Sequence, residues 1–283
     1  MAKQINSKDK PNENALERYK KHKCNSNEIS EVTKSKDVHF VRDGFAYEDT
    51  YTKLKEPKVL FIGKEPHHFT ERQSPIICSE DDLKLENFKK WSKVTFYQNL
   101  MFYFYAIDSW YSTPQKYTFE LSDCNLKTDD DETVSKLIDL FKKIAFINIK
   151  KWDTKDSTSR EATIKQYAAE YKIPLREQIK AIDPDIIFLC GTDKAFRELF
   201  EKQEINLEKD DDQDFNNLSY LDDKYKWFYF VELNNKTRLV INYYHPSFTQ
   251  RPGWIDVLAV QNILRNAKTY MSKHNNVMNN LNL

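Results

Sequence analysis

The sequence predicts an α/β fold, a three-layer α/β/α domain in which a mainly parallel, four-stranded central sheet lies between two layers of helices. Continuous runs of aliphatic, β-branched and aromatic residues without polar alternation are typical of strands covered on both faces. Segments with the period of amphipathic helices separate these runs, and such alternation favours a parallel sheet. With 40% hydrophobic and 14% aromatic residues, a chain of 283 residues can form a large core. The predicted core strands lie at 59–63, 144–150, 185–191 and 237–244.

The N-terminal segment is polar and is predicted to lie outside the core. Residues 1–30 are rich in Lys, Asn and Ser, with one short helix expected at 15–21, and they lack the apolar stretch of a signal peptide. No apolar run approaches the roughly 20 residues that a membrane-spanning helix needs. We therefore expect a cytoplasmic protein without a membrane partner. The predicted division is an N-terminal arm and peripheral segment at 1–57 and an α/β domain at 58–283, with an acidic insertion near 204–223.

The first core strand ends at a glycine and passes directly into polar residues. In open parallel sheets, ligands bind beyond the carboxyl ends of the strands, so this segment is a candidate site. An ordinary polar turn is the alternative interpretation. The segment consists of Gly63, Lys64, Glu65, Pro66, His67 and His68.

Two helical segments are predicted between the first and second core strands. Residues 87–108 are aromatic with a helical period, and we expect them to pack in the core rather than to stack on bases. Residues 128–141 begin with acidic side chains that favour a helix N-terminus, and their apolar residues then recur at helical spacing. The predicted buried faces comprise Phe88, Trp91, Phe96, Leu100, Phe104, Val134, Leu137, Ile138 and Phe141.

The second core strand carries one amide, Asn148, in an apolar setting. A buried amide needs hydrogen-bond partners, and a carboxamide has both an acceptor and donors that can read the edge of a base. Hydrogen bonds to neighbouring backbone are the alternative. Lys150 and Lys151 follow, and the loop at 152–160 is rich in Ser, Thr and Asp, which suits either phosphate contacts or plain solvent exposure.

The second half of the domain continues the alternation. A helix at 174–182 precedes the third core strand, and Thr192 is expected to cap the helix that follows it. Strands at 227–233 and 237–244 flank two asparagines, which predicts a hairpin and an antiparallel strand beside the last core strand. A long helix at 255–270 is expected to close the domain. The last core strand runs into His245, Pro246 and Ser247.

Charge and composition restrict the possible function classes. Lys+Arg and Asp+Glu both number 44, and a net charge of zero argues mildly against a nucleic-acid binder. The acidic residues concentrate at 129–132 and 208–214, however, while cations flank the candidate strand ends. The four cysteines contain no C-x-x-C pair, so we expect no metal. Four glycines form no Gly-rich phosphate loop, which excludes dinucleotide and P-loop sites, and we expect no cofactor.

The segments after the first and last core strands resemble motifs of the uracil-DNA glycosylase superfamily. Typical members carry G-Q-D-P-Y-H and H-P-S there, and this chain carries G-K-E-P-H-H and H-P-S in the same order, within a resemblance that spans 58–270. The resemblance implies a uracil-DNA glycosylase-like fold. It implies that Glu65 orients the attacking water and balances the cationic sugar, and that His245 donates a hydrogen bond to the departing base. Asn148, in a setting similar to N-x-x-K, would read the pyrimidine.

The same resemblance implies how DNA would be held. Flipping a nucleotide out of the stack costs a few kcal/mol, which backbone contacts and an inserted side chain must offset. The two motifs match phosphate-pinching segments of the family, and the residues after H-P-S usually include an apolar wedge. The DNA-binding residues expected on this basis are Lys64, Pro66, Lys151, Pro246, Ser247, Phe248 as the wedge, and Arg251.

Three departures from the family pattern affect the expected substrate. Glu65 replaces an aspartate, His67 replaces a tyrosine that screens out groups at the pyrimidine 5-position, and Cys78 replaces a phenylalanine that stacks on the base. We therefore expect a pocket that no longer selects plain uracil. The base-binding residues expected are Gly63, His67, His68, Cys78 and Asn148.

The resulting hypothesis is a DNA glycosylase that hydrolyses the N-glycosidic bond of a flipped-out, modified pyrimidine in DNA. We expect a monomer, and defence against phage with modified DNA is a candidate role. An ordinary uracil-DNA glycosylase of base-excision repair is one alternative, and a catalytically silent nucleic-acid-binding module on the same scaffold is another. We further expect Glu65 and His245 to face one cleft beneath Asn148.

Overall fold

The computed structural model covers most of the predicted domain and part of the N-terminal segment. Five predicted site residues, His67, His68, Cys78, Phe248 and Arg251, lie outside the described residues, as does all but 205–206 of the acidic insertion. No helix in the described part of the chain is long and apolar enough to span a membrane. The structure describes residues 11–22, 29, 40–55, 57–66, 84–91, 95–112, 131–153, 159–201, 205–206, 227–247 and 253–273.

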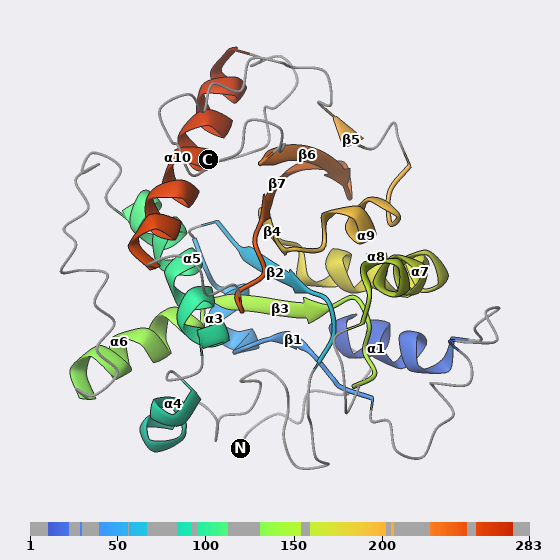
Figure 1. The fold of residues 1–283 in the computed structure, drawn as a ribbon, viewed down its shortest axis with the longest axis horizontal. Coiled ribbons are helices and arrows are strands. Elements are labelled where there is room, and N and C mark those ends of the chain that lie inside the picture. The colour runs from blue at the N-terminus through green and yellow to red at the C-terminus, as the bar shows by residue number, and fades with distance from the viewer. Residues whose placement is uncertain are drawn as a thin grey trace.

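The described strands form one seven-stranded mixed sheet with the order β1-β3-β2-β4-β7-β6-β5 (Figure 1). Its centre is parallel, because β2 pairs in parallel with both β3 and β4, and β4 pairs in parallel with β7. The strands are β1 (Gly44–Phe45), β2 (Val59–Gly63), β3 (Ile144–Asn148), β4 (Ile186–Cys190), β5 (Ile205–Asn206), β6 (Phe228–Leu233) and β7 (Lys236–Tyr243).

The predicted α/β class is confirmed, but the sheet is wider than the four strands expected. β1, β5 and β6 extend it with antiparallel pairings at its two edges. The β6–β7 hairpin is as predicted: Asn234 and Asn235 both have φ of 57°, the left-handed conformation of a tight hairpin turn. β1 and β5 have only two residues each, too few for any detectable period in the sequence.

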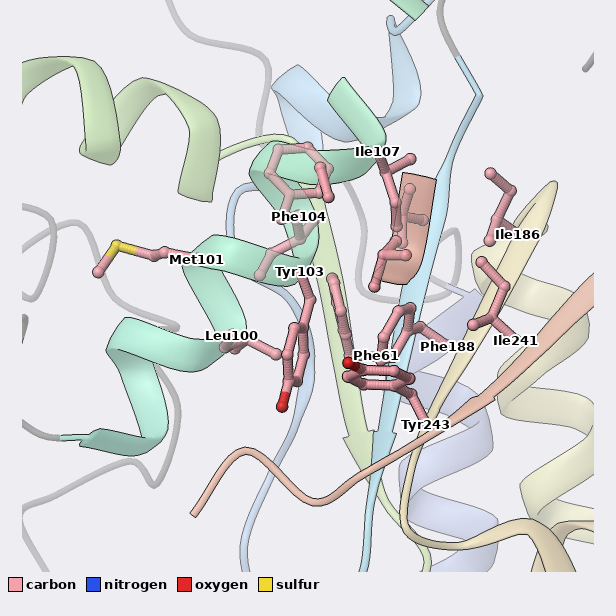
Figure 2. Close-up of a cluster of buried hydrophobic side chains, with 14 of the residues drawn as sticks. Phe61, Leu100, Met101, Tyr103, Phe104, Ile107, Ile186, Phe188, Ile241 and Tyr243 are labelled. Carbon is pink, nitrogen blue, oxygen red and sulfur yellow. The ribbon is translucent and has the colours of Figure 1, made fainter. Parts of the chain in front are cut away.

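Helices cover both faces of the sheet, so the layers are helix, sheet and helix (Figure 1). Along β2, Val59 and Phe61 join one buried cluster, whereas Leu60 and Ile62 join the other. Figure 2 shows part of the first cluster, where strand residues such as Phe61 meet side chains of α5. The first cluster includes α4 (Leu85–Trp91), α5 (Thr95–Ser112), α6 (Asp131–Phe141) and α10 (Gly253–Lys273); the second includes α1 (Pro11–Lys21), α3 (Glu48–Thr52), α7 (Glu161–Glu170), α8 (Lys172–Ile182) and α9 (Asp193–Arg197).

The predicted helical core is largely confirmed. The segment expected as one helix at 87–108 forms α4 and α5, and the side chain of Trp91 lies outside the described set. The prediction that Phe96 is buried is wrong, because its ring is only partly buried at the edge of the first cluster. The other predicted residues are buried: Phe88, Leu100, Phe104, Val134, Leu137, Ile138 and Phe141.

Part of the N-terminal segment packs onto the domain. Tyr19 of α1 is buried, and its ring stacks on that of Tyr171 with centroids 4.2 Å apart. β1 pairs with β3 in the sheet. These contacts join residues on both sides of the boundary expected at residue 57.

The strand order creates a switch point at the carboxyl ends of β2 and β4. From β2 the chain passes to β3 on one side and then crosses to β4 on the other. In doubly wound sheets, ligands bind at such a point. The two strand ends are tied together, because Thr192 Oγ1 donates to the Ile62 carbonyl at 3.0 Å. Thr192 occupies the N-cap position of α9. The prediction that its side chain caps this helix is wrong, because the side chain makes no hydrogen bond to the helix backbone.

Candidate functional site

Asn148 lies directly against Gly63 at the carboxyl ends of two paired strands. The two residues are in register across β2 and β3. A Cβ atom on Gly63 would lie 2.7 Å from Asn148 Oδ1 and 2.7 Å from Phe146 Cζ, closer than real Cβ contacts. The absence of a side chain at residue 63 therefore allows the carboxamide to lie over β2.

Asn148 is anchored through its backbone. The backbone N–H donates to Asp43 Oδ2 at 2.7 Å. Among the residues that the structure describes, none hydrogen-bonds the side-chain carboxamide, although only 4% of Asn148 is exposed. The alternative expectation, an amide satisfied by neighbouring backbone, therefore finds no support in this part of the chain. A carboxamide in this setting can offer its acceptor and its donors to a ligand.

His245 follows β7 and packs against the end of β4. Gly191 has φ of 67°, and a Cβ atom there would lie 3.4 Å from both the Cβ and the backbone N of His245. The Ser247 N–H donates to His245 Nδ1 at 3.2 Å. A neutral imidazole that accepts at Nδ1 carries its proton on Nε2. The ring is therefore set to donate a hydrogen bond from Nε2.

Two further hydrogen bonds hold the end of β7 and the segment that follows it. Asn99 of α5 is buried, and its Nδ2 donates to the Pro246 carbonyl at 2.6 Å. The Tyr243 hydroxyl donates to Asp256 Oδ1 of α10 at 2.7 Å. Sequence reasoning missed Asn99, although an amide within an otherwise aromatic helix was a signal that could have identified it.

An aromatic pair connects Asn148 to His245. The Phe96 ring is T-shaped against Phe146, with centroids 5.8 Å apart, and its centroid lies 5.8 Å from that of His245. Phe146 is buried beside Gly63, whereas Phe96 is partly exposed. Asn148, Phe146, Phe96 and His245 are therefore successive neighbours at this edge of the sheet.

Glu65 is held by a buried cluster of donors. Its Oε1 accepts the Ser159 backbone N–H, and its Oε2 accepts both the Ser159 hydroxyl and Lys150 Nζ, the latter at 2.9 Å. The Glu65 side chain is fully buried and that of Lys150 is 2% exposed. The sequence identified Lys150 only as a nearby cation and did not single out Ser159.

The Glu65 cluster keeps the carboxylate ionised. Burial by itself raises the pKa of Glu65, but hydrogen bonds from Ser159 and Lys150 outweigh it, so the pKa lies below its ordinary value. The imidazole of His245 lies against Phe96, whereas the carboxylate of Glu65 faces Lys150 and Ser159. That both face one cleft stays a prediction.

The expected DNA contact of Lys151 requires a correction. Its side chain is fully buried, and its Nζ lies 2.6 Å from Asp43 Oδ1, whose side chain is also fully buried. Burial lowers the pKa of Lys151, and the Asp43 carboxylate opposes that shift. The ammonium lies 5.7 Å from the centroid of the Tyr19 ring of α1. Lys151 is therefore directed into the helix layer and cannot contact a DNA phosphate in this conformation.

The remaining predicted residues of the two motifs lie beside these groups. Lys64 is partly exposed, and its carbonyl accepts the Lys150 N–H at 2.9 Å. Pro66 and Pro246 are buried, whereas Ser247 is exposed. Lys64 and Ser247 are therefore the two predicted DNA contacts with accessible surface in the described part of the chain.

Metal-binding geometry, surface hollows and comparisons with known proteins were each considered for this site. Within the described ranges, no cluster of three or more His, Cys, Asp and Glu residues could hold a metal ion. Described hollows of about 500 Å³ beside Tyr47 and Lys53, and of about 310 Å³ beside Lys84 and Lys89, are not lined by residues of this site. Comparisons with protein-family models, curated proteins and solved structures each found no match to the chain.

Proposed function

We propose that the protein is a DNA glycosylase that hydrolyses the N-glycosidic bond of a flipped-out, modified pyrimidine. The observation that carries this proposal is the position of Asn148. Its carboxamide lies over Gly63 at the switch point of the sheet, and no described residue hydrogen-bonds it. Such an amide can pair with the donors and acceptors on a pyrimidine edge, which a flipped-out nucleotide exposes.

His245 would stabilise the departing base. When the N-glycosidic bond breaks, the base leaves with negative charge on its ring. A donor aimed at the base oxygen stabilises that charge more in the transition state than in the substrate. The Ser247 N–H at Nδ1 favours the tautomer with its proton on Nε2, which supports this role.

Glu65 would act on the sugar. Positive charge develops on the sugar as the base departs, and a fixed carboxylate nearby stabilises it and orients the attacking water. Because hydrogen bonds hold the pKa of Glu65 below its ordinary value, the side chain is a weak base. We therefore assign it an electrostatic and orienting role rather than proton abstraction.

The resemblance of G-K-E-P-H-H and H-P-S to the uracil-DNA glycosylase superfamily supports the same proposal. Both motifs follow central parallel strands, β2 and β7, which lie on either side of β4. A uracil-DNA glycosylase-like, three-layer fold with four parallel core strands belongs to this proposal. So do DNA as the partner, a monomeric state, a cytoplasmic location and a role in defence against phage with modified DNA.

One observation favours a catalytically silent nucleic-acid-binding module instead. The Glu65 side chain is fully buried and paired with Lys150, which neutralises much of the charge that catalysis would use. A different observation favours an ordinary uracil-DNA glycosylase. The partly exposed ring of Phe96 beside His245 can stack on a base and restore a uracil-sized slot.

The deciding experiment measures base release. The protein is incubated with single-stranded and double-stranded oligonucleotides that contain uracil, a bulky 5-substituted cytosine or only unmodified bases. Abasic sites are detected by alkaline strand cleavage, and the released base by mass spectrometry. We expect abasic sites at the 5-substituted cytosine. Preferential release of uracil would establish the repair enzyme, and DNA binding without any base release would establish the silent module.

Variants link the reaction to the site. We expect Asn148→Ala to lower the rate of base release by about 10- to 100-fold, since a well-placed pair of hydrogen bonds to a base is worth about 1–3 kcal/mol. Glu65→Gln, which keeps the shape and removes the charge, should abolish release while the protein stays folded. His67→Tyr should shift the preference towards uracil. An unchanged preference in His67→Tyr would refute the widened pocket.

A further inference from the structure

Two neighbouring lysines just beyond β3 have different carboxylate partners. Lys150 and Lys151 are both almost completely buried, and each is paired with its own buried carboxylate. Lys150 Nζ lies 2.9 Å from Glu65, and Lys151 Nζ lies 2.6 Å from Asp43. Burying one such ion pair is expensive, and a pair of apolar side chains often serves stability as well. Stability alone does not explain two buried ion pairs at adjacent residues, so each pair is considered in turn.

The Lys151 pair belongs to the framework of the fold. Asp43 accepts hydrogen bonds from Lys151, from Gln178 Nε2 of α8 at 3.0 Å and from the backbone of Asn148. The Asp43 carbonyl also accepts Asn12 Nδ2 of α1 at 3.4 Å. This network joins α1, α8 and the end of β3, and it reaches the site through the backbone of Asn148 but does not include the carboxylate of Glu65.

The Lys150 pair belongs to the candidate site. Lys150 donates to Glu65 and also to the Ser159 hydroxyl, at 3.2 Å, and its ammonium lies 5.6 Å from the centroid of the Tyr167 ring. Ser159 in turn donates its backbone N–H and its hydroxyl to the two oxygens of Glu65. Both carboxylate oxygens are therefore held, from two segments distant in sequence from β2. Such contacts fix the rotation of the carboxylate as well as its position.

We propose that Lys150 and Ser159 are positioning residues that hold the Glu65 carboxylate ionised and in one orientation, whereas Lys151 supports the fold and, through Asp43, the backbone of Asn148. This inference rests on the proposed glycosylase function and deepens it. Catalysis by fixed charge requires the charge to be in place before the reaction begins. Glu65 would be prepared by its partners in this way, at the end of β2.

The proposal predicts a dependence on pH with a definite sign. Lys150 is a charged group that lowers the pKa of Glu65, and Ser159 is a neutral donor that also lowers it. Without Lys150, one of the two residues that lower the pKa of Glu65 is lost, so the carboxyl would take up a proton at higher pH. An activity that needs the carboxylate is lost as the pH falls through that pKa. Removing Lys150 should therefore move the acid limb of the activity profile towards higher pH.

The experiment compares the two lysines as matched variants of the full chain. The pH profile of kcat/KM for base release is measured for wild type, Lys150→Met, Ser159→Ala and Lys151→Met. We expect the acid limb of Lys150→Met to move up by about one pH unit or more, the effect of an opposite charge at this distance. Ser159→Ala should move it in the same direction, because the Ser159 hydroxyl also lowers the pKa of Glu65. Lys151→Met should lower thermal stability and leave the limb in place, and Lys150→Arg should retain the wild-type limb.

A second measurement tests the inference without relying on activity. The titration of Glu65 is followed by carbon NMR of protein labelled at its glutamate carboxyl groups, with Glu65→Gln identifying the signal. A higher titration midpoint in Lys150→Met or Ser159→Ala, but not in Lys151→Met, supports the positioning role. Equal midpoints in all variants overturn it. If Lys150→Met does not fold, Ser159→Ala decides the question, because Ser159 is only partly buried.

The two proposals can fail separately. A wild-type protein that releases no base from any oligonucleotide refutes the glycosylase function, and the NMR titration then decides the role of Lys150 and Ser159 by itself. A wild type that releases a base, with an acid limb that is unmoved in both Lys150→Met and Ser159→Ala, refutes the positioning role alone.

Discussion

Replacing Gly63 by alanine tests the geometry on which the candidate site depends. Gly63 lies in the extended strand β2, a conformation that alanine adopts readily, so the effect of the substitution is steric. The added methyl group would lie 2.7 Å from Asn148 Oδ1 and from Phe146 Cζ. Overpacking of this kind typically costs about 1–3 kcal/mol. The Asn148 side chain must also move, so base release should fall about 10-fold or more beyond the effect on stability.

The assay is a double-mutant cycle with Asn148→Ala. The free energy of unfolding is obtained from urea denaturation followed by circular dichroism, for wild type, both single variants and the double variant. Because Asn148→Ala removes one of the two clashing atoms, Gly63→Ala should cost less in that background, with a coupling of about 0.5–3 kcal/mol. Part of the destabilisation by Gly63→Ala should remain in that background, because the clash with Phe146 persists. An equal cost of Gly63→Ala in both backgrounds would refute the contact between Asn148 and Gly63.

Three further predictions follow from single contacts. Asn99→Leu leaves the Pro246 carbonyl without the donor that Asn99 supplies, so the variant should lose about 1–3 kcal/mol of unfolding free energy in urea denaturation. It should also release the base more slowly. An unchanged release rate would exclude a positioning role for this hydrogen bond. Burial raises the pKa of Asp183, but Arg238 and Lys236 together outweigh it and the pKa is lowered. The resulting stability is present at neutral pH and is lost as the pH falls through the folded-state pKa. Asp183→Asn, which tolerates the left-handed φ of 49°, should therefore show a shallower loss of stability in acid, and an equally steep loss would contradict this reasoning. Lys64→Ala should reduce the salt dependence of DNA binding by a slope of about 0.9, and an unchanged slope would mean that Lys64 does not contact a phosphate.

The sequence by itself determined the parts of the fold that depend on local pattern. Unbroken apolar runs predicted the central strands because strands buried on both faces need apolar residues at every position. Paired asparagines predicted the β6–β7 turn because this turn requires a left-handed conformation that asparagine tolerates. Strand ends that carry Glu65, Asn148 and His245 indicated one functional edge, because the ends of parallel strands lie together.

Only the tertiary structure decided what those polar side chains contact. Lys150 and Lys151 are adjacent and chemically identical, yet one meets Glu65 and the other meets Asp43. Their partners lie 85 and 108 residues away, and no local period relates residues so distant in sequence. Burial of Lys151 and of the Asp43 carboxylate follows from the packing of α1 and α8 against the sheet, which forms only when all layers are present. The sequence therefore indicates which edge carries polar chemistry, and packing between distant segments determines which of its charges are buried, paired or accessible.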